Sequence, residues 1–215
     1  MSKWKKPIHI PIAIGIAVSL IWLIQIVFGY MPYTDRLLGR FVEQFHDTYV
    51  YTFFRFMTDF GSGHFLIPFT IVLTVLLIFI YRSFLPAFIF AGGTLCTHLL
   101  NLLIKHMVER ERPSLLEEAN ALGYSFPSGH AMISLVCYGL AVYFIRQKIV
   151  HKQMTIILQL GTFLFIMFIG LSRYVIHVHY MTDVIVGFVT GVILLHLFIS
   201  LYEKISNRKK NDLPG

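Results

Sequence analysis

The chain has 215 residues, of which 56% are apolar and only 13% are charged. A soluble domain carries about 25% charged residues, so this composition excludes an ordinary soluble domain and a disordered chain. The net charge of +7 is no sign of nucleic-acid binding, which needs a basic patch on a water-exposed fold. The two cysteines, Cys96 and Cys137, lie in apolar runs and form neither a disulfide framework nor a zinc cluster. We therefore expect a single integral membrane domain over residues 1–215.

Six apolar runs are each long enough to cross a bilayer as a helix, which takes about 20 residues. None carries Asp, Glu, Lys or Arg in its middle. The first run is too long for the apolar core of a signal peptide, and no small-residue cleavage site follows it, so we expect a retained anchor. The fold class predicted is an all-α bundle of six transmembrane helices. Its expected spans are 8–30, 62–81, 85–105, 130–146, 153–171 and 182–202.

Residues 36–57 separate the first two spans and repeat apolar side chains at helical spacing. Charged side chains such as Arg36, Arg40 and Asp47 fall between them. This pattern predicts an amphipathic helix lying at the outer membrane interface. An extension of the second span is the alternative.

The distribution of Lys and Arg predicts the orientation, because cytoplasmic loops carry the excess of positive charge. Eleven of these residues lie on one side of the expected spans and seven on the other. We therefore expect both termini in the cytoplasm and the long segments 31–61 and 106–129 outside a plasma membrane. Three of the seven outside cations belong to the candidate site described next, so the bias among the remaining cations is stronger.

Polar side chains from four distant regions fall at the outer ends of the last four expected spans. A helical bundle can bring such ends together at one membrane face. The residues concerned are Lys105, Arg112, Ser128, His130, Ser172, Arg173, His179 and Asp183.

Lys105 and Arg112 are seven residues apart, so in a helix they would lie two turns apart on one face. A single basic residue at a span end is usually an anchor that reaches the interface. Ser128 is a good helix N-cap, and the free N–H groups of a helix start bind anions. His130 follows directly and would face the bound anion, although a plain capped helix explains the same residues.

His179 and Asp183 are four residues apart and share a face if the sixth span begins near them. A neighbouring carboxylate fixes the tautomer of a histidine and makes its other nitrogen more nucleophilic. An incidental pair remains an alternative, as does metal binding by His177, His179 and Asp183. The nearby cations would oppose a metal ion.

Together these residues predict phosphoryl transfer through a phosphohistidine. Cations and backbone N–H groups would bind the phosphate oxygens, one histidine would attack, and the other would protonate the leaving oxygen. The nucleotide-binding pattern GxxxxGK[ST] and the zinc pattern HExxH are absent from the sequence.

With these three stretches the sequence resembles the type 2 phosphatidic acid phosphatase family. Its members are integral membrane lipid phosphatases that share a helical core with soluble vanadium-dependent haloperoxidases. The matching positions are Lys105, Arg112 and Pro113 of K-x6-R-P, Pro127, Ser128, Gly129 and His130 of P-S-G-H, and Ser172, Arg173, His179 and Asp183 of S-R-x5-H-x3-D.

The resemblance implies a role for most of the matching residues. His179 is the expected nucleophile and Asp183 its orienting carboxylate, while His130 acts first as acid and then as base. No metal or other cofactor is implied, and Ser172 receives no assigned contact. Residues 58–62 also resemble a recurrent element of bacterial members, or are simply a turn into the second span. The implied phosphate cradle consists of Lys105, Arg112, Ser128, Gly129 and Arg173.

The resemblance further implies a membrane lipid phosphate as substrate. Phosphatidylglycerophosphate and undecaprenyl pyrophosphate rank level, because nothing in the loops separates them, with a broad phosphatidate or lysophosphatidate phosphatase as the alternative. A transporter and a catalytically silent lipid-binding member are the other classes considered. Gly187 and Gly191 predict close helix packing, within the monomer or in a dimer, and the oligomeric state is left open.

Overall fold

The computed structural model describes residues 9–45, 48–113 and 123–211. Within these ranges the chain is helical and contains no strand. Residue 8 of the first expected span, Lys3, Lys5 and Lys6 of the charge count, and residues 46–47 of the expected interfacial helix lie outside them. The elements are α1 (His9–Val27), α2 (Tyr33–Val42), the short 3₁₀ helix η1 (Glu43–Phe45), α3 (Tyr49–Asp59), α4 (Gly63–Tyr81), α5 (Phe84–Val108), α6 (Gly129–Arg146), α7 (Lys152–Val175) and α8 (Met181–Asn211).

Six of these helices, α1 and α4 to α8, are long and apolar enough to cross a membrane. The all-α fold with six membrane helices is thereby confirmed. Three helices continue well past the expected spans, since α5 reaches Val108, α7 reaches Val175 and α8 reaches Asn211. In α8 the polar last turns simply prolong the apolar span.

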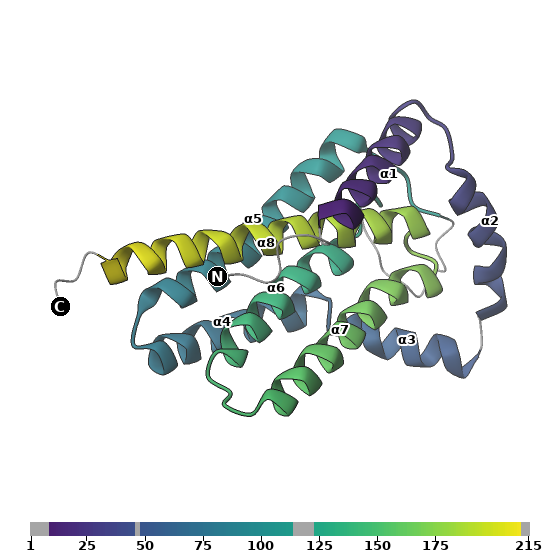
Figure 1. Ribbon diagram of the computed structural model, residues 1–215. Helices are drawn as coiled ribbons and strands as arrows, with labels where there is room; N and C mark the ends of the chain where they lie inside the picture. The colour runs from purple at the N-terminus through teal and green to yellow at the C-terminus, as the bar shows by residue number, and fades with distance from the viewer. Residues whose placement is uncertain (1–8, 46–47, 114–122, 212–215) are drawn as a thin grey trace.

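Helix α6 forms the centre of the bundle and packs against α5, α7 and α8 (Figure 1). Its side chains Leu140 and Phe144 are fully buried, as are Phe90 of α5 and Ile169 of α7. Because lipid tails are as apolar as these side chains, close packing rather than water exclusion holds such helices together.

Two glycines of α8 allow its backbone to approach α6. A Cβ atom at Gly187 would lie 2.8 Å from the Ser128 carbonyl oxygen, and one at Gly191 would lie 3.1 Å from the Met132 carbonyl oxygen. The pair expected to pack helices therefore does so inside the monomer.

The outer surface of the bundle is apolar. None of the membrane-spanning window of α1 is buried in the protein, and this helix lies against α8, where Gly15 faces Val189 (Figure 1). Large exposed side chains such as Ile21 and Phe79 point away from the bundle. Such a surface requires a hydrocarbon environment.

The expectation of one amphipathic helix over 36–57 is wrong. The segment forms α2, η1 and α3, which lie at the end of the bundle where α7 ends and α8 begins (Figure 1). The break has a local cause, because the Thr48 hydroxyl accepts a hydrogen bond from the Tyr51 N–H and caps a new helix.

Candidate active site

Lys105 and Arg112 reach the site from different backbone conformations. Helix α5 ends at Val108, and Glu109 follows with a left-handed φ of 50°. The two cations therefore do not share one helical face, since Arg112 lies beyond the helix. Both side chains nevertheless converge on the loop before α6, where Lys105 Nζ and Arg112 Nη2 donate to the Tyr124 carbonyl.

The start of α6 is shaped as the sequence predicts. Ser128 is the N-cap, and its hydroxyl accepts from the Ala131 N–H at 3.5 Å. Ser128 is fully buried, so its hydroxyl serves the helix start while Gly129 and His130 line the cavity. Asn101 of α5 fixes this turn by donating to the Pro127 carbonyl at 3.2 Å.

Arg173 ends its helix buried in the protein. One guanidinium nitrogen donates to the Thr58 hydroxyl at 2.7 Å. Its Nε has no hydrogen-bond partner within the described part of the chain. A buried cation with an unused donor is suited to binding an anion.

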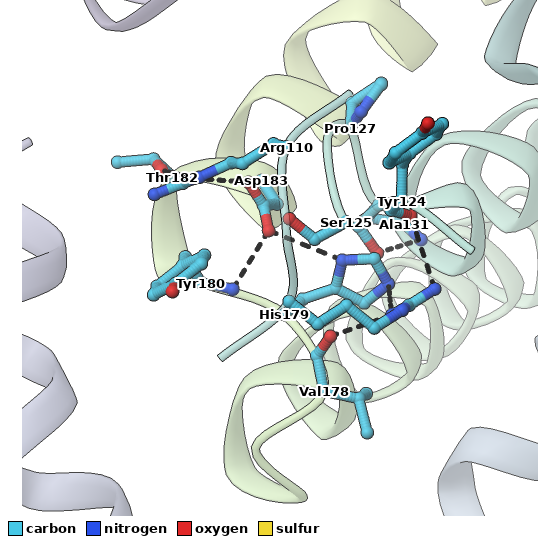
Figure 2. A network of polar contacts seen from close by, with 12 residues as sticks. Arg110, Tyr124, Ser125, Pro127, Ala131, Val178, His179, Tyr180, Thr182 and Asp183 are labelled. Carbon is cyan, nitrogen blue, oxygen red and sulfur yellow. Dashed lines mark hydrogen bonds and ion pairs between the residues drawn. The ribbon is translucent and has the colours of Figure 1, made fainter. Parts of the chain in front are cut away.

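The His179 ring lies between Arg112 and Asp183, and Figure 2 shows the Asp183 carboxylate beside it. Nε2 of His179 accepts from Arg112 Nη1 at 3.1 Å, which places the proton of a neutral ring on Nδ1. Nδ1 lies 3.4 Å from Asp183 Oδ2, beyond ordinary hydrogen-bond length. Catalytic hydrogen bonds are often this long before substrate binds.

A cavity of about 680 Å³ joins these residues. Both histidines face it, and the His130 ring lies so close to Gly61 that a Cβ there would be 2.7 Å from the ring. Its polar end is lined by Asn101, Lys105, Arg112, Gly129, His130, Arg173 and His179, and its remaining wall by Gly61, Gly63, Leu66, Ile67, Thr70, Ile71, Ala91, Thr94, Leu95, His98 and Ile133. The cavity is thus polar at the helix ends that carry the three motifs and largely apolar between α4 and α5.

The electrostatics favour a neutral His179. Burial lowers the pKa of His179 well below the ordinary value, and the cations Arg173, Arg112 and Lys105 lower it further. Burial also lowers the pKa of Arg112, although the charge of Asp183 opposes this shift. The unprotonated ring needed for nucleophilic attack is therefore the dominant form near neutral pH.

The structure adds three residues to those expected from the sequence, Arg110, Asp35 and Asn101, and gives a contact to Thr58 of the element singled out at 58–62. Arg110 binds Asp183 and Asp35, Thr58 binds Arg173, and Asn101 holds the turn before α6. Arg110 was detectable in principle, because it is a further cation in the short segment between Lys105 and Arg112. Asp35 had no local signal, since its partners lie 75 and 147 residues away.

No group of three or more metal-ligating side chains is found in residues 9–45, 48–113 and 123–211. His177, considered as a possible ligand beside His179, has a left-handed φ of 58°. The donor set offered to a bound group is instead cationic, which suits a phosphate.

The chain belongs to the PAP2 superfamily, whose family profile matches residues 84–206. It is 31% identical over 153 residues to phosphatidylglycerophosphatase B of Bacillus subtilis, an alignment that covers 69% of this chain and 73% of the relative. It is 29% identical over 170 residues to dolichyldiphosphatase of Saccharomyces cerevisiae, which covers 74% of this chain and 70% of the relative.

Solved structures share the fold. A crystal structure described as a transmembrane PAP2-type phosphatidylglycerolphosphate phosphatase from Bacillus subtilis matches with a TM-score of 0.77 at 21% identity, covering 88% of this chain and 96% of that one. LpxE of Aquifex aeolicus matches with a TM-score of 0.60 at 22% identity, covering 79% and 96%. The protein is therefore a multi-span membrane lipid phosphate phosphatase.

Proposed function

We propose that this protein removes a phosphate from a membrane lipid through a phosphohistidine on His179, without a metal ion. One observation carries the proposal. Two histidines and three cations share one end of a cavity whose other wall is apolar and lies between membrane-spanning helices. A phosphate fits the first region and a lipid chain fits the second.

The first half of the reaction forms a bond from His179 Nε2 to phosphorus and breaks the bond from phosphorus to the leaving oxygen. When substrate binds, the guanidinium of Arg112 donates to the substrate phosphate in place of His179 Nε2. The lone pair of Nε2 is then free to attack phosphorus. His130 gives a proton to the leaving oxygen, which is worth about 10²–10⁴-fold in rate. Lys105, Arg112 and Arg173 hold the phosphate oxygens, together with the Gly129 N–H.

In the second half a water molecule replaces the departed lipid. His130, now unprotonated, accepts a proton from this water as its oxygen bonds to phosphorus. The bond from phosphorus to Nε2 breaks, and inorganic phosphate leaves. Asp183 stabilises the positive charge that the His179 ring carries while it is phosphorylated.

The chemistry of the cavity favours phosphatidylglycerophosphate and undecaprenyl pyrophosphate as substrates. The named relatives include a phosphatidylglycerophosphatase and a dolichyldiphosphatase. His98 lines the cavity seven residues before Lys105, about 10 Å further along the helix axis. A polar group at that depth suits the phosphodiester of phosphatidylglycerophosphate, which a glycerol separates from the terminal phosphate.

We place the active site on the outer face of the plasma membrane and both termini in the cytoplasm. The excess of Lys and Arg among the segments at the opposite end of the bundle supports this orientation. An outer site suits the recycling of an undecaprenyl carrier, whereas phosphatidylglycerophosphate would first have to cross the bilayer.

The test is phosphate release by detergent-purified protein from each lipid, in excess chelator, with His179→Ala alongside. We expect release by the wild type alone and a trapped phosphohistidine after acid-free quenching. His98→Leu should lower kcat/KM for phosphatidylglycerophosphate more than for undecaprenyl pyrophosphate. Release that disappears with chelator would overturn the metal-free mechanism, and no release from any lipid would favour a silent lipid-binding member.

A further inference from the structure

Arg110 lies outside the cavity but beside the catalytic pair. Its Nη1 donates to Asp183 Oδ1 and, at 2.9 Å, to the Thr182 hydroxyl. Its Nη2 donates to Asp35 Oδ2 at 2.7 Å. The Arg110 side chain is 9% exposed and both carboxylates are 0% exposed, so these ion pairs form in the protein interior.

Asp35 ties this arginine to α2. Its carboxylate also accepts from the Thr182 N–H at 3.0 Å and from the Thr182 hydroxyl at 2.6 Å. Thr182 lies in the first turn of α8, where free N–H groups favour a carboxylate. The first turn of α2 is thereby bonded to the first turn of α8, one residue before Asp183.

These bonds fix both oxygens of Asp183. Oδ1 accepts from Arg110, and Oδ2 accepts from the Tyr180 N–H at 3.0 Å while facing Nδ1 of His179 (Figure 2). The Tyr180 ring lies 3.9 Å from the centre of the guanidinium and restricts its movement. A carboxylate held at both oxygens presents one lone pair in a fixed direction.

Resting on the proposed function, we propose that Arg110 is a positioning residue for phosphoryl transfer. Anchored by Asp35 of α2, it holds Asp183 in the orientation from which that carboxylate stabilises His179 during attack. Catalysis then depends on the position of α2 relative to the start of α8, at the outer end of the bundle. Arg110 touches neither substrate nor the reacting atoms.

The proposal predicts that loss of Arg110 or Asp35 lowers the turnover rate but leaves substrate binding nearly unchanged. Arg110→Gln and Asp35→Asn should lower kcat by about tenfold or more, because an unsupported Asp183 no longer meets Nδ1. KM, and the inhibition constant for inorganic phosphate, should stay within about twofold, because neither residue lines the cavity. Arg110→Lys, which keeps the charge, should recover part of the loss. Quenched-flow trapping should show slower formation of the phosphohistidine.

The double variant distinguishes a shared role from two separate ones. If Asp35 acts through Arg110, Asp35→Asn in an Arg110→Gln background should cost far less than it does alone. Arg40→Gln is the matched control, since Arg40 is an exposed cation of α2, the helix that contains Asp35. Thermal unfolding in detergent identifies variants that fold, and where Arg110→Gln does not, Arg110→Lys and Asp35→Asn carry the test.

Two outcomes separate this inference from the proposed function. Wild-type kcat in folded Asp35→Asn and folded Arg110→Lys would overturn the positioning role while leaving the phosphohistidine intact. Equal losses in kcat and in phosphate affinity would also overturn it, because they indicate a general distortion of the site. Full activity of His179→Ala would instead reject the proposed mechanism itself.

Discussion

At the residue scale, three parts of the candidate site are set in place by a second group behind them. Thr58 accepts from Arg173, Asn101 donates to the turn that carries Gly129, and Arg110 binds Asp183. Such supporting contacts keep reacting groups within the narrow range of geometry that catalysis requires. The residues proposed to bind phosphate could be predicted because they form spaced motifs, whereas their supports come from unrelated positions.

The pH dependence of the free enzyme should report the environment of His179. Burial and three cations lower its pKa, so the neutral nucleophile persists into acid, and activity is lost only as pH falls through that lowered pKa. We expect the acid limb of kcat/KM to lie below about pH 6.5, the ordinary histidine value. Lys105→Met removes a cation that lowers the pKa, so the limb should move to higher pH.

The measurement is a kcat/KM profile with the same lipid for wild type, Lys105→Met and the exposed-site control Arg40→Gln. Because the substrate is identical in all three, its own ionisation does not change the comparison. A limb that stays in place in Lys105→Met would contradict the assignment of His179 as the titrating nucleophile.

Thr58→Val should weaken phosphate binding through Arg173. The substitution keeps the shape of the side chain but removes the oxygen that accepts from the guanidinium. An unsatisfied buried donor costs about 1–3 kcal/mol, which should appear as a lower unfolding temperature and a several-fold higher KM. Added inorganic phosphate should restore part of the thermal stability by taking up the free donor.

Thr155→Val serves as the comparison, because Thr155 is half-buried on α7 and its hydroxyl bonds only its own helix backbone, at an exposed position, in the described structure. Equal shifts in KM for both variants would show that Thr58 has no special relation to phosphate.

At the element scale, the long apolar runs located all six long helices but did not predict their connections. Residues 36–57 repeat apolar side chains so regularly that the sequence predicts one helix, yet Thr48 starts a second helix after η1. The end of α5 also depends on a single residue. Glu109 has a left-handed backbone and follows the last residue of the helix, so Arg110 and Arg112 lie in a non-helical segment beyond it.

The packing of α8 on α6 should be sensitive to one methyl group. In Gly187→Ala the new Cβ would meet the Ser128 carbonyl, a backbone atom of the turn that we propose binds phosphate. Relief of this overlap must move α8 or the turn, at a cost of about 1–3 kcal/mol. We expect a lower unfolding temperature together with reduced kcat/KM.

Gly161→Ala is the matched control for this prediction. Gly161 also lies in a membrane-spanning helix, but a Cβ there meets nothing within 4 Å. Wild-type stability and activity in Gly187→Ala would show that the close approach of the two helices is not needed at the site.

At the scale of the whole molecule, the sequence motifs and the helical plan are mutually consistent. The motifs lie at the outer ends of expected spans, and the structure brings those ends together around one cavity. What the sequence could not show is how α2 joins the site, because the contact from Asp35 to Thr182 spans 147 residues. Only the assembled bundle brings those two positions together.

The orientation of the bundle in the membrane is the last prediction. The distribution of Lys and Arg predicts that α2 lies outside the cell and that the connection between α6 and α7 lies in the cytoplasm. After replacement of Cys96 and Cys137 by alanine, a cysteine at Arg40 should react with a membrane-impermeant maleimide in intact cells. A cysteine at Lys152 should react only after the cells are permeabilised.

Both positions are exposed in the structure, so access from the aqueous phase decides the labelling. The reverse pattern would place the phosphate site on the cytoplasmic face. It would then favour phosphatidylglycerophosphate, which is made there, over a carrier that is recycled outside. The labelling experiment therefore tests the topology and narrows the choice between the two substrates, because a membrane lipid meets the site only on the face where its phosphate lies.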